Sequence, residues 1–245
     1  DGALGRRGAA MIDDYSDQSG HTGLLLHNPE RLEYLMRAAM NAGFQVNTHA
    51  IGDNANKAVL DNYEQLIAQT NSKDLRHRVE HAQILRYEDI LRFAELGVIP
   101  SMQATHATSD KNMAVDRIGE IRIQGAYAWR KLIDSGALIA NGSDFPVESP
   151  NPFFGLHAAI TRQDKNNQPP GGWFPEEKMT TIEAFASFTI DAAYSGHQEK
   201  LLGTLEPGKK ADFIILDRDM FAIDESEIWQ IEVRQTWVNG QRVTD

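Results

Sequence analysis

The sequence contains no cysteine, which excludes a disulfide-stapled scaffold, a thiolate metal site and a cysteine nucleophile. It also lacks any run that approaches the roughly 18 apolar residues that a membrane-spanning helix needs. Its first residues show no basic segment followed by an apolar stretch, so no signal peptide is visible. The missing apolar run predicts no membrane partner, and the missing signal peptide predicts a cytoplasmic location.

Positive charge is also scarce, because 24 lysine and arginine residues face 35 aspartate and glutamate residues, a net charge of −11. A surface of that sign repels nucleic acid and anionic membranes, so neither is an expected partner. Charged residues make up 24% and hydrophobic residues 41% of the chain, a composition typical of folded globular proteins that excludes global disorder. A length of 245 residues allows one large domain or two smaller ones.

Short apolar runs alternate with helical patterns at least four times between residues 44 and 161, which is typical of parallel βα units. Strands are predicted over 44–49, 76–81, 98–103 and 137–140, and the helices that follow them over 53–67, 87–96, 124–134 and 152–161. A helix that begins at Pro29, capped by Asn28 and stopped by Gly43, precedes the first strand. Residues 1–28 are expected to form a loop and 104–123 a polar connection.

The pattern changes after residue 165 and becomes richer in β structure. A helix is predicted over 180–193, with Thr180 or Thr181 as its cap and Glu183 near the capping-box position. A buried strand over 211–216 follows, and then a hairpin over 231–243 whose Asn-Gly pair favours a type I′ turn. The tail is therefore interpreted as a second, small subdomain.

Polar residues stand where the predicted strands end, and they are His49, His81, Gln103 and Asp144. In a βα barrel these carboxyl ends form the active face. A lone histidine at a strand end is more often a hydrogen-bonded structural group. Three potential ligands at the same position of successive units make a metal site the better interpretation. Imidazole and carboxylate are the usual zinc ligands when cysteine is absent. The sequence therefore predicts a divalent metal, zinc by preference, held by His49, His81 and Asp144.

Asp144 has two further interpretations. A carboxylate beside metal-activated water can act as the general base, since the metal lowers the pKa of that water towards ~7. Alternatively, Ser143 and Asp144 can cap a helix, as Asp53 is expected to do. Substrate-binding candidates are Gln103, His106, Arg122 and Tyr127, with Asp110 and Arg162 beside them, and a surface or solvated-face role is as good an interpretation for each. Glu80 is interpreted as structural, and five histidines are taken as non-ligands: His21, His27, His77, His157 and His197.

Several segments, in this order, resemble the amidohydrolase superfamily, and more narrowly the YtcJ-like group of amidohydrolase family 3. They are 1–9 (DGALGRRGA), 48–53 (THAIGD), 78–83 (RVEHAQ), 101–103 (SMQ) with His106, 142–148 (GSDFPVE) and the tail 203–213 (GTLEPGKKADF). Each motif is short, but the set covers essentially the whole chain and its order is specific.

The resemblance implies a metal-dependent hydrolase on a distorted (β/α)8 TIM-type barrel with a small β-sandwich. Such enzymes hydrolyse C–N bonds of amide, N-acyl or formamide type in small molecules. By position, His49 resembles the metal ligand of the fifth barrel strand and His81 that of the sixth. Asp144 resembles the residue of the eighth strand that is both ligand and general base.

The sequence departs from the family pattern because it has no His-x-His pair, which the family carries on its first strand. The family's bridging lysine of the fourth strand would fall before Asp1. The expectation is therefore an α/β chain that forms the C-terminal half of the barrel over 1–200 (strands five to eight) and part of the β-sandwich over 201–245. Its partner would be the missing N-terminal half or a second copy of the chain, and the isolated chain is expected to be inactive.

Two other functions stay open from the sequence. One is a catalytically inactive or regulatory module with an amidohydrolase-like fold, which the missing His-x-His pair favours. The other is a metal-free βα-barrel enzyme whose polar strand ends bind the substrate directly.

Overall fold

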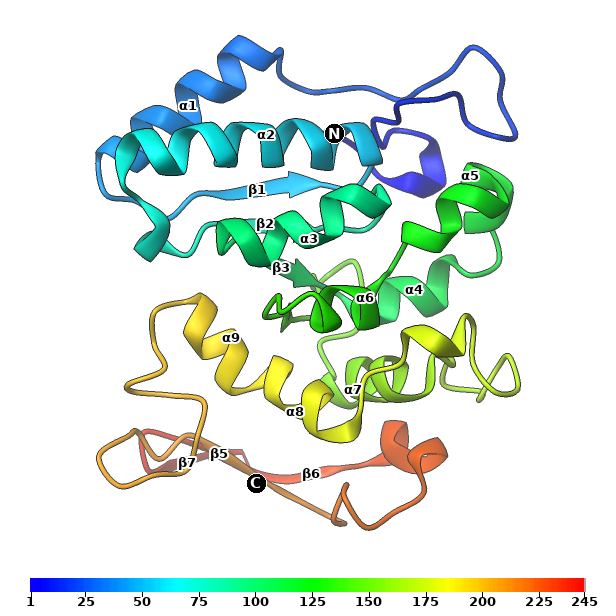
Figure 1. Cartoon of the computed structure of the whole chain (residues 1–245). Coiled ribbons are helices and arrows are strands. Elements are labelled where there is room, and N and C mark those ends of the chain that lie inside the picture. Colours follow the sequence, from blue (N-terminus) through cyan, green and yellow to red (C-terminus); the bar gives the residue numbers. More distant parts are fainter. Residues whose placement is uncertain (245) are drawn as a thin grey trace. The chain divides into compact units, whose positions relative to one another are not determined.

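The computed structural model describes residues 1–244 and divides into two compact units. The first unit consists of Asp1–Met102 and Asp110–Ile139, and the second of Gln103–Ser109 and the chain from Ala140 onward. Most of the first unit is coloured blue to green in Figure 1, and most of the second yellow to red. The domain boundary expected after residue 200 stays a prediction.

Three parallel strands form the sheet of the first unit (Figure 1). They lie in the order β1, β2, β3, with the bounds Asn47–Ala50, Arg78–His81 and Ile99–Met102. The register places His49 opposite Glu80 and Ala50 opposite His81. The parallel pairing predicted from the sequence is confirmed, and the carboxyl ends of these strands meet at one edge of the sheet.

Helices α1, α2 and α3 pack on one another in chain order. Their bounds are Pro29–Asn41, Asp53–Thr70 and Tyr87–Leu96. The predicted ends of two of them are confirmed, because the Asn28 side chain accepts a hydrogen bond from the Arg31 amide at 2.8 Å and Gly97, with φ of 68°, ends α3. Within residues 1–244, no helix combines the length and the apolar character that crossing a membrane requires.

Helix α2 packs on one face of the sheet, and α3 contacts β3. Tyr63 of α2 places its hydroxyl 2.8 Å from the Arg78 carbonyl oxygen, and Val79 is fully buried on that face. The pleat puts His49 and Glu80 on the other face, where the Glu80 carboxylate accepts a hydrogen bond from the Arg78 guanidinium at 2.8 Å. Glu80 therefore has a charged partner on its own strand, which supports its interpretation as a structural residue.

The polar connection over 104–123 is largely helical, which the sequence pattern did not predict. It contains α4 (Ala104–Asp110) and α5 (Ala114–Arg122). The helix expected over 124–134 begins later, as α6 (Trp129–Asp134), because a 3₁₀ turn ends at Gly125 and Tyr127 has a left-handed backbone with φ of 50°. Helical propensity without an apolar stripe is a weak signal, so these short helices escape sequence analysis.

From Ala140 to Ser195 the second unit contains a short strand and three α-helices. They are β4 (Ala140–Asn141), α7 (Pro152–Thr161), α8 (Thr181–Phe188) and α9 (Ile190–Ser195). The capping box of Thr180 and Glu183 is confirmed. The single helix expected over 180–193 is wrong, because Thr189, with φ of −124° and ψ of −94°, separates α8 from α9.

An antiparallel sheet follows in the second unit (Figure 1). Its strands, in order, are β5 (Phe213–Leu216), β6 (Val233–Val238) and β7 (Gln241–Thr244). Asn239 and Gly240 join β6 to β7 with φ of 52° and 75°, as a type I′ turn requires. The predicted hairpin is confirmed, and so is the strand before it, but the expectation that this strand is buried is wrong, because Ile214 and Ile215 are each 43% exposed.

The N-terminal segment, expected to be a loop, docks on the turn between β1 and α2. The buried Ala10 carbonyl accepts hydrogen bonds from the first amides of α2, those of Asn54 at 3.1 Å and Ala55 at 3.3 Å. Gly52 is the N-cap of α2, so the expectation that Asp53 caps this helix is wrong. The Asp53 carboxylate instead accepts a hydrogen bond from the Ile12 amide at 2.9 Å, which fixes the segment from the other side.

Gly52 is required by this docking. A Cβ atom at this position would lie 2.0 Å from the Ala10 carbonyl oxygen, so Gly52→Ala must displace backbone. We expect the substitution to lower the free energy of unfolding by about 1–3 kcal/mol or more. Gly5→Ala is the control, because its added methyl meets only the end of the Met113 side chain at 3.6 Å. Urea unfolding of both variants checks the prediction, and equal stabilities would contradict the docking.

His77 predicts a pH dependence of stability. Its imidazole is buried, Nδ1 accepts a hydrogen bond from the Val46 amide at 3.0 Å, and burial lowers its pKa from 6.5 to about 4. The unfolded chain therefore binds more protons below pH 6.5, so this stabilisation is present above pH 6.5 and is lost as the pH falls towards 4. We expect a loss of about 2 kcal/mol between pH 7.5 and 5.0.

The measurement is urea unfolding at both pH values for the wild-type chain and for His77→Gln. The glutamine keeps an acceptor for the Val46 amide but does not titrate. An equal decline in both proteins would assign the pH dependence to other groups.

Candidate functional site

Two of the predicted metal ligands lie side by side in the first unit. His49 is the last but one residue of β1 and His81 is the last residue of β2. Their ring centroids are 4.4 Å apart, and the ring planes meet at 70°. The strand ends therefore bring the two imidazoles together as the sequence analysis expected, while their role as ligands stays a prediction.

The backbone of His81 explains this proximity. In a regular pleat, the residue opposite Ala50 would point away from the face that carries His49. His81 has φ of 77° and Ala82 has φ of 43°, both in the left-handed region that non-glycine residues avoid. This break in the pleat turns the His81 imidazole towards His49, and the strain costs of order 1–3 kcal/mol at each residue.

Asp1 is a site residue that sequence analysis missed. Its side chain is fully buried, and one carboxylate oxygen lies 3.2 Å from His49 Nδ1. The carboxylate also accepts hydrogen bonds from the amides of Ile51 at 3.1 Å, Gly52 at 2.8 Å and Ala10 at 3.0 Å. No local pattern marks a contact between residues 48 positions apart, and only the motif over 1–9 pointed to this segment.

Asp144, the predicted general base, belongs to the second unit. It has a left-handed backbone with φ of 55°, and its carboxylate lies 3.9 Å from His106 Nε2. The side chain of Asp144 is 39% exposed, whereas that of His106 is 12% exposed. Asn151 caps α7, so the alternative interpretation of Asp144 as a helix cap is wrong.

The segment after Asp144 faces α4 within the second unit. Ser109 of α4 donates a hydrogen bond from its hydroxyl to the Glu148 carboxylate at 2.7 Å, one turn along from His106. Gln103 is buried just before α4, and its carbonyl accepts a hydrogen bond from the His106 amide at 3.1 Å. Two of the substrate-binding candidates therefore lie in the same unit as Asp144.

Tyr127 takes part in a buried polar cluster in the first unit. Its hydroxyl donates to the Asp110 carboxylate at 2.6 Å and accepts from the Gln83 amide at 2.8 Å. The same Gln83 nitrogen lies 3.0 Å from Asp110. Gln83, two residues after His81, thus contacts the candidate Tyr127. The sequence marked Gln83 only as part of the motif over 78–83.

The two arginine candidates have structural partners. Arg122 donates hydrogen bonds to the carbonyls of Asp13 at 3.0 Å and Asp14 at 2.7 Å, which ties α5 to the N-terminal segment. Arg162 is fully buried in the second unit, where it bonds the Trp173 carbonyl at 2.8 Å and stacks over the Trp173 ring. Substrate binding by Arg122 stays a prediction.

The histidines taken as non-ligands include two that are buried and hydrogen-bonded, His77 and His157. His157 lies between the carbonyl oxygens of Glu225 and Asp164, each 3.1 Å from a ring nitrogen, and burial lowers its pKa. Like His77, it links distant segments of the chain by hydrogen bonds. Across residues 1–244, no three histidine, aspartate or glutamate side chains gather closely enough to hold a metal ion. The metal centre of His49, His81 and Asp144 accordingly stays a prediction.

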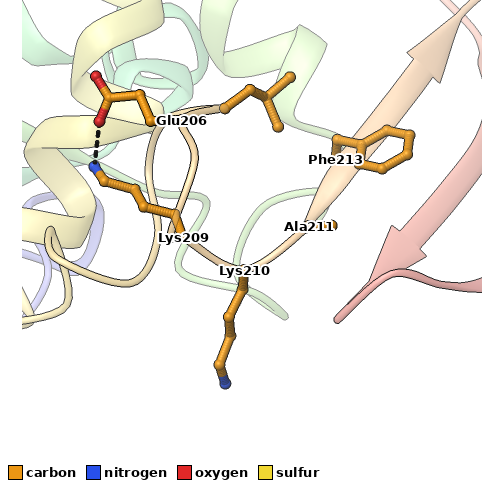
Figure 2. A pocket seen from close by; sticks show the side chains of 6 residues that line it. Glu206, Lys209, Lys210, Ala211 and Phe213 are labelled. Atoms are coloured by element: carbon orange, nitrogen blue, oxygen red, sulfur yellow. Dashed lines mark ion pairs between the residues drawn. The ribbon is translucent and has the colours of Figure 1, made fainter.

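A pocket of about 290 Å³ in the second unit contains none of the predicted site residues. It is lined by Leu205, Glu206, Lys209, Lys210, Ala211 and Phe213. Figure 2 shows Lys209 pointing to Glu206, 3.4 Å away, while Lys210 points away from both. The ion pair is exposed at Glu206, so it adds little to stability.

Comparison with known proteins gives matches along the whole chain. A family model described as the amidohydrolase family matches residues 1–244. The putative amidohydrolase YtcJ of Bacillus subtilis is 35% identical over 99% of this chain and 45% of its own length. The protein LONG AFTER FAR-RED 3 of Arabidopsis thaliana is 36% identical over 99% of this chain and 41% of its own. The N-substituted formamide deformylase of Arthrobacter pascens is 26% identical over 90% of this chain and 40% of its own length.

A solved structure shares the fold. The crystal structure of an uncharacterized metal-dependent hydrolase from Pyrococcus horikoshii OT3 superimposes with a TM-score of 0.80 and 31% identity, over 92% of this chain and 44% of that chain. The chain therefore spans less than half the length of each of these relatives. It has an α/β fold with a parallel sheet, and the match over residues 1–244 shows that the chain belongs to the amidohydrolase family.

Proposed function

We propose that the whole protein is a metal-dependent hydrolase that cleaves C–N bonds of amide, N-acyl or formamide type in small molecules. The observation that carries the proposal is the pair of imidazoles, His49 and His81, 4.4 Å apart at the ends of adjacent parallel strands. Family membership supports it, as do the names of two relatives, a deformylase of N-substituted formamides and a metal-dependent hydrolase.

His49 and His81 suit a divalent metal, because adjacent imidazoles are ligands that zinc sites use when cysteine is absent. Across residues 1–244 no three such side chains lie close enough to hold the ion, so the third ligand belongs to the proposal. We propose His49, His81 and Asp144 as the ligands and zinc as the ion. When bound, the metal would supply the Lewis acidity that makes water a nucleophile at neutral pH.

Asp144 has the proton-transfer role in this proposal. Its carboxylate, more than a third exposed, takes a proton from the attacking water and returns it to the leaving nitrogen. His106 and Gln103, in the same unit, and Tyr127 are proposed to contact the substrate. The bonds of Arg122 to backbone carbonyls make it the least favoured of the four candidates.

The fold of the whole protein is also a proposal. Because the chain spans less than half the length of its relatives, we propose that β1 to β4 are strands five to eight of a (β/α)8 barrel. The sheet of β5, β6 and β7 would be part of a β-sandwich. The N-terminal half of the protein or a second copy of the chain would complete the barrel.

His81 gives the sharpest test of the function. His81→Asn removes one proposed ligand, and in the whole protein we expect kcat/KM for N-substituted formamides and N-acyl amines to fall at least about 100-fold, since a Lewis acid contributes several kcal/mol. His27→Asn is the matched control, because His27 is exposed and was predicted to be no ligand.

Chelation, followed by restoration with Zn²⁺, should abolish and then recover the hydrolysis. Unchanged turnover in His81→Asn, or full activity after exhaustive chelation, would contradict the proposal. No turnover of any C–N substrate by a correctly folded whole protein would favour the inactive or regulatory alternative.

A further inference from the structure

The environment of Asp1 is unusual for a charged side chain. Its carboxylate is fully buried, and burying an unpaired charge is strongly unfavourable. Three backbone amides donate hydrogen bonds to it, those of Ala10, Ile51 and Gly52, and Nδ1 of His49 lies 3.2 Å from one of its oxygens. The three amides are in fixed positions, so the carboxylate has a defined location into which the His49 ring must fit.

This contact determines the protonation pattern of the His49 ring. An ionised carboxylate only accepts hydrogen bonds, so the ring nitrogen that faces it, Nδ1, carries the hydrogen. In neutral imidazole the lone pair then resides on Nε2. Histidines that ligate metals commonly donate the hydrogen of their other nitrogen to a carboxylate, which fixes the tautomer and the ring orientation.

We propose that Asp1 is a positioning residue for His49, whose buried carboxylate holds the imidazole in the Nδ1–H tautomer and leaves Nε2 as the donor atom for a metal ion. The metal part of this inference rests on the proposed function, whereas the tautomer part does not. The amides of Ile51 and Gly52 belong to the turn that follows β1, so the same turn fixes both the carboxylate and the strand that carries His49.

A purely structural role for Asp1 makes a different prediction. In that case the carboxylate only anchors the N-terminal segment to the turn after β1, and its loss would lower stability without changing His49. Asp53 is the matched control, because it is also a buried carboxylate that bonds an amide of this segment, that of Ile12 at 2.9 Å.

The test is long-range ¹H–¹⁵N NMR of the imidazoles of the whole, metal-free protein at pH 8, with the His49 signals identified by their absence in His49→Gln. The wild-type protein and Asp53→Asn should show His49 protonated at Nδ1. Asp1→Asn should convert His49 to the Nε2–H tautomer or to a mixture. Protonation of His49 at Nε2 in the wild-type protein would overturn the inference even if Asp1→Asn does not fold, and so would an unchanged tautomer in a folded Asp1→Asn.

Titration with Zn²⁺, alone and in competition with a chelator, gives the second readout. We expect Asp1→Asn in the whole protein to bind the ion about 10–100-fold more weakly than the wild-type protein, with Asp53→Asn unchanged. Equal affinities of Asp1→Asn and the wild-type protein would overturn the positioning role. If no variant binds the ion while the tautomer changes as expected, the proposed metal fails and the inference about His49 is upheld.

Discussion

The close approach of the Ala10 carbonyl to the turn at Gly52 is the constraint on which the candidate site depends. Because Gly52 has no side chain, the N-terminal segment can reach the end of β1. There the Ala10 carbonyl also accepts hydrogen bonds from the first amides of α2. That contact brings the Asp1 carboxylate to the imidazole of His49. One steric requirement therefore links a loop, the start of a helix and the orientation of a proposed metal ligand.

Three proposed site residues have a left-handed backbone, as do nine other non-glycine residues among residues 1–244. His81, Tyr127 and Asp144 are all non-glycine residues with φ between 50° and 77°. Each such residue costs of order 1–3 kcal/mol, and such strain persists where the surrounding structure over-determines it, often at functional sites. At His81 the strain has a visible effect, because it turns the imidazole to the face of the sheet that carries His49.

The sequence predicts local features well and long-range ones poorly. The first helix with its Asn28 cap, the Thr180 capping box and the Asn239–Gly240 turn are decided by neighbours in the chain, so their patterns are visible. The pairing of His49 and His81 follows from the rule that parallel strands end at one edge. The contact of Asp1 with His49 and the left-handed His81 depend on packing between distant segments, which no local pattern encodes.

The central claim is that the polar strand ends of this chain bind a catalytic metal. Elemental analysis of the whole protein purified without chelator, beside the double variant His49→Gln, His81→Gln, tests it most directly. We expect at least about one equivalent of zinc or a similar divalent ion per protein molecule, lost in a double variant that still folds, because two of the proposed ligands are removed. Absence of metal from the wild-type protein, or equal metal content in the variant, would contradict the claim.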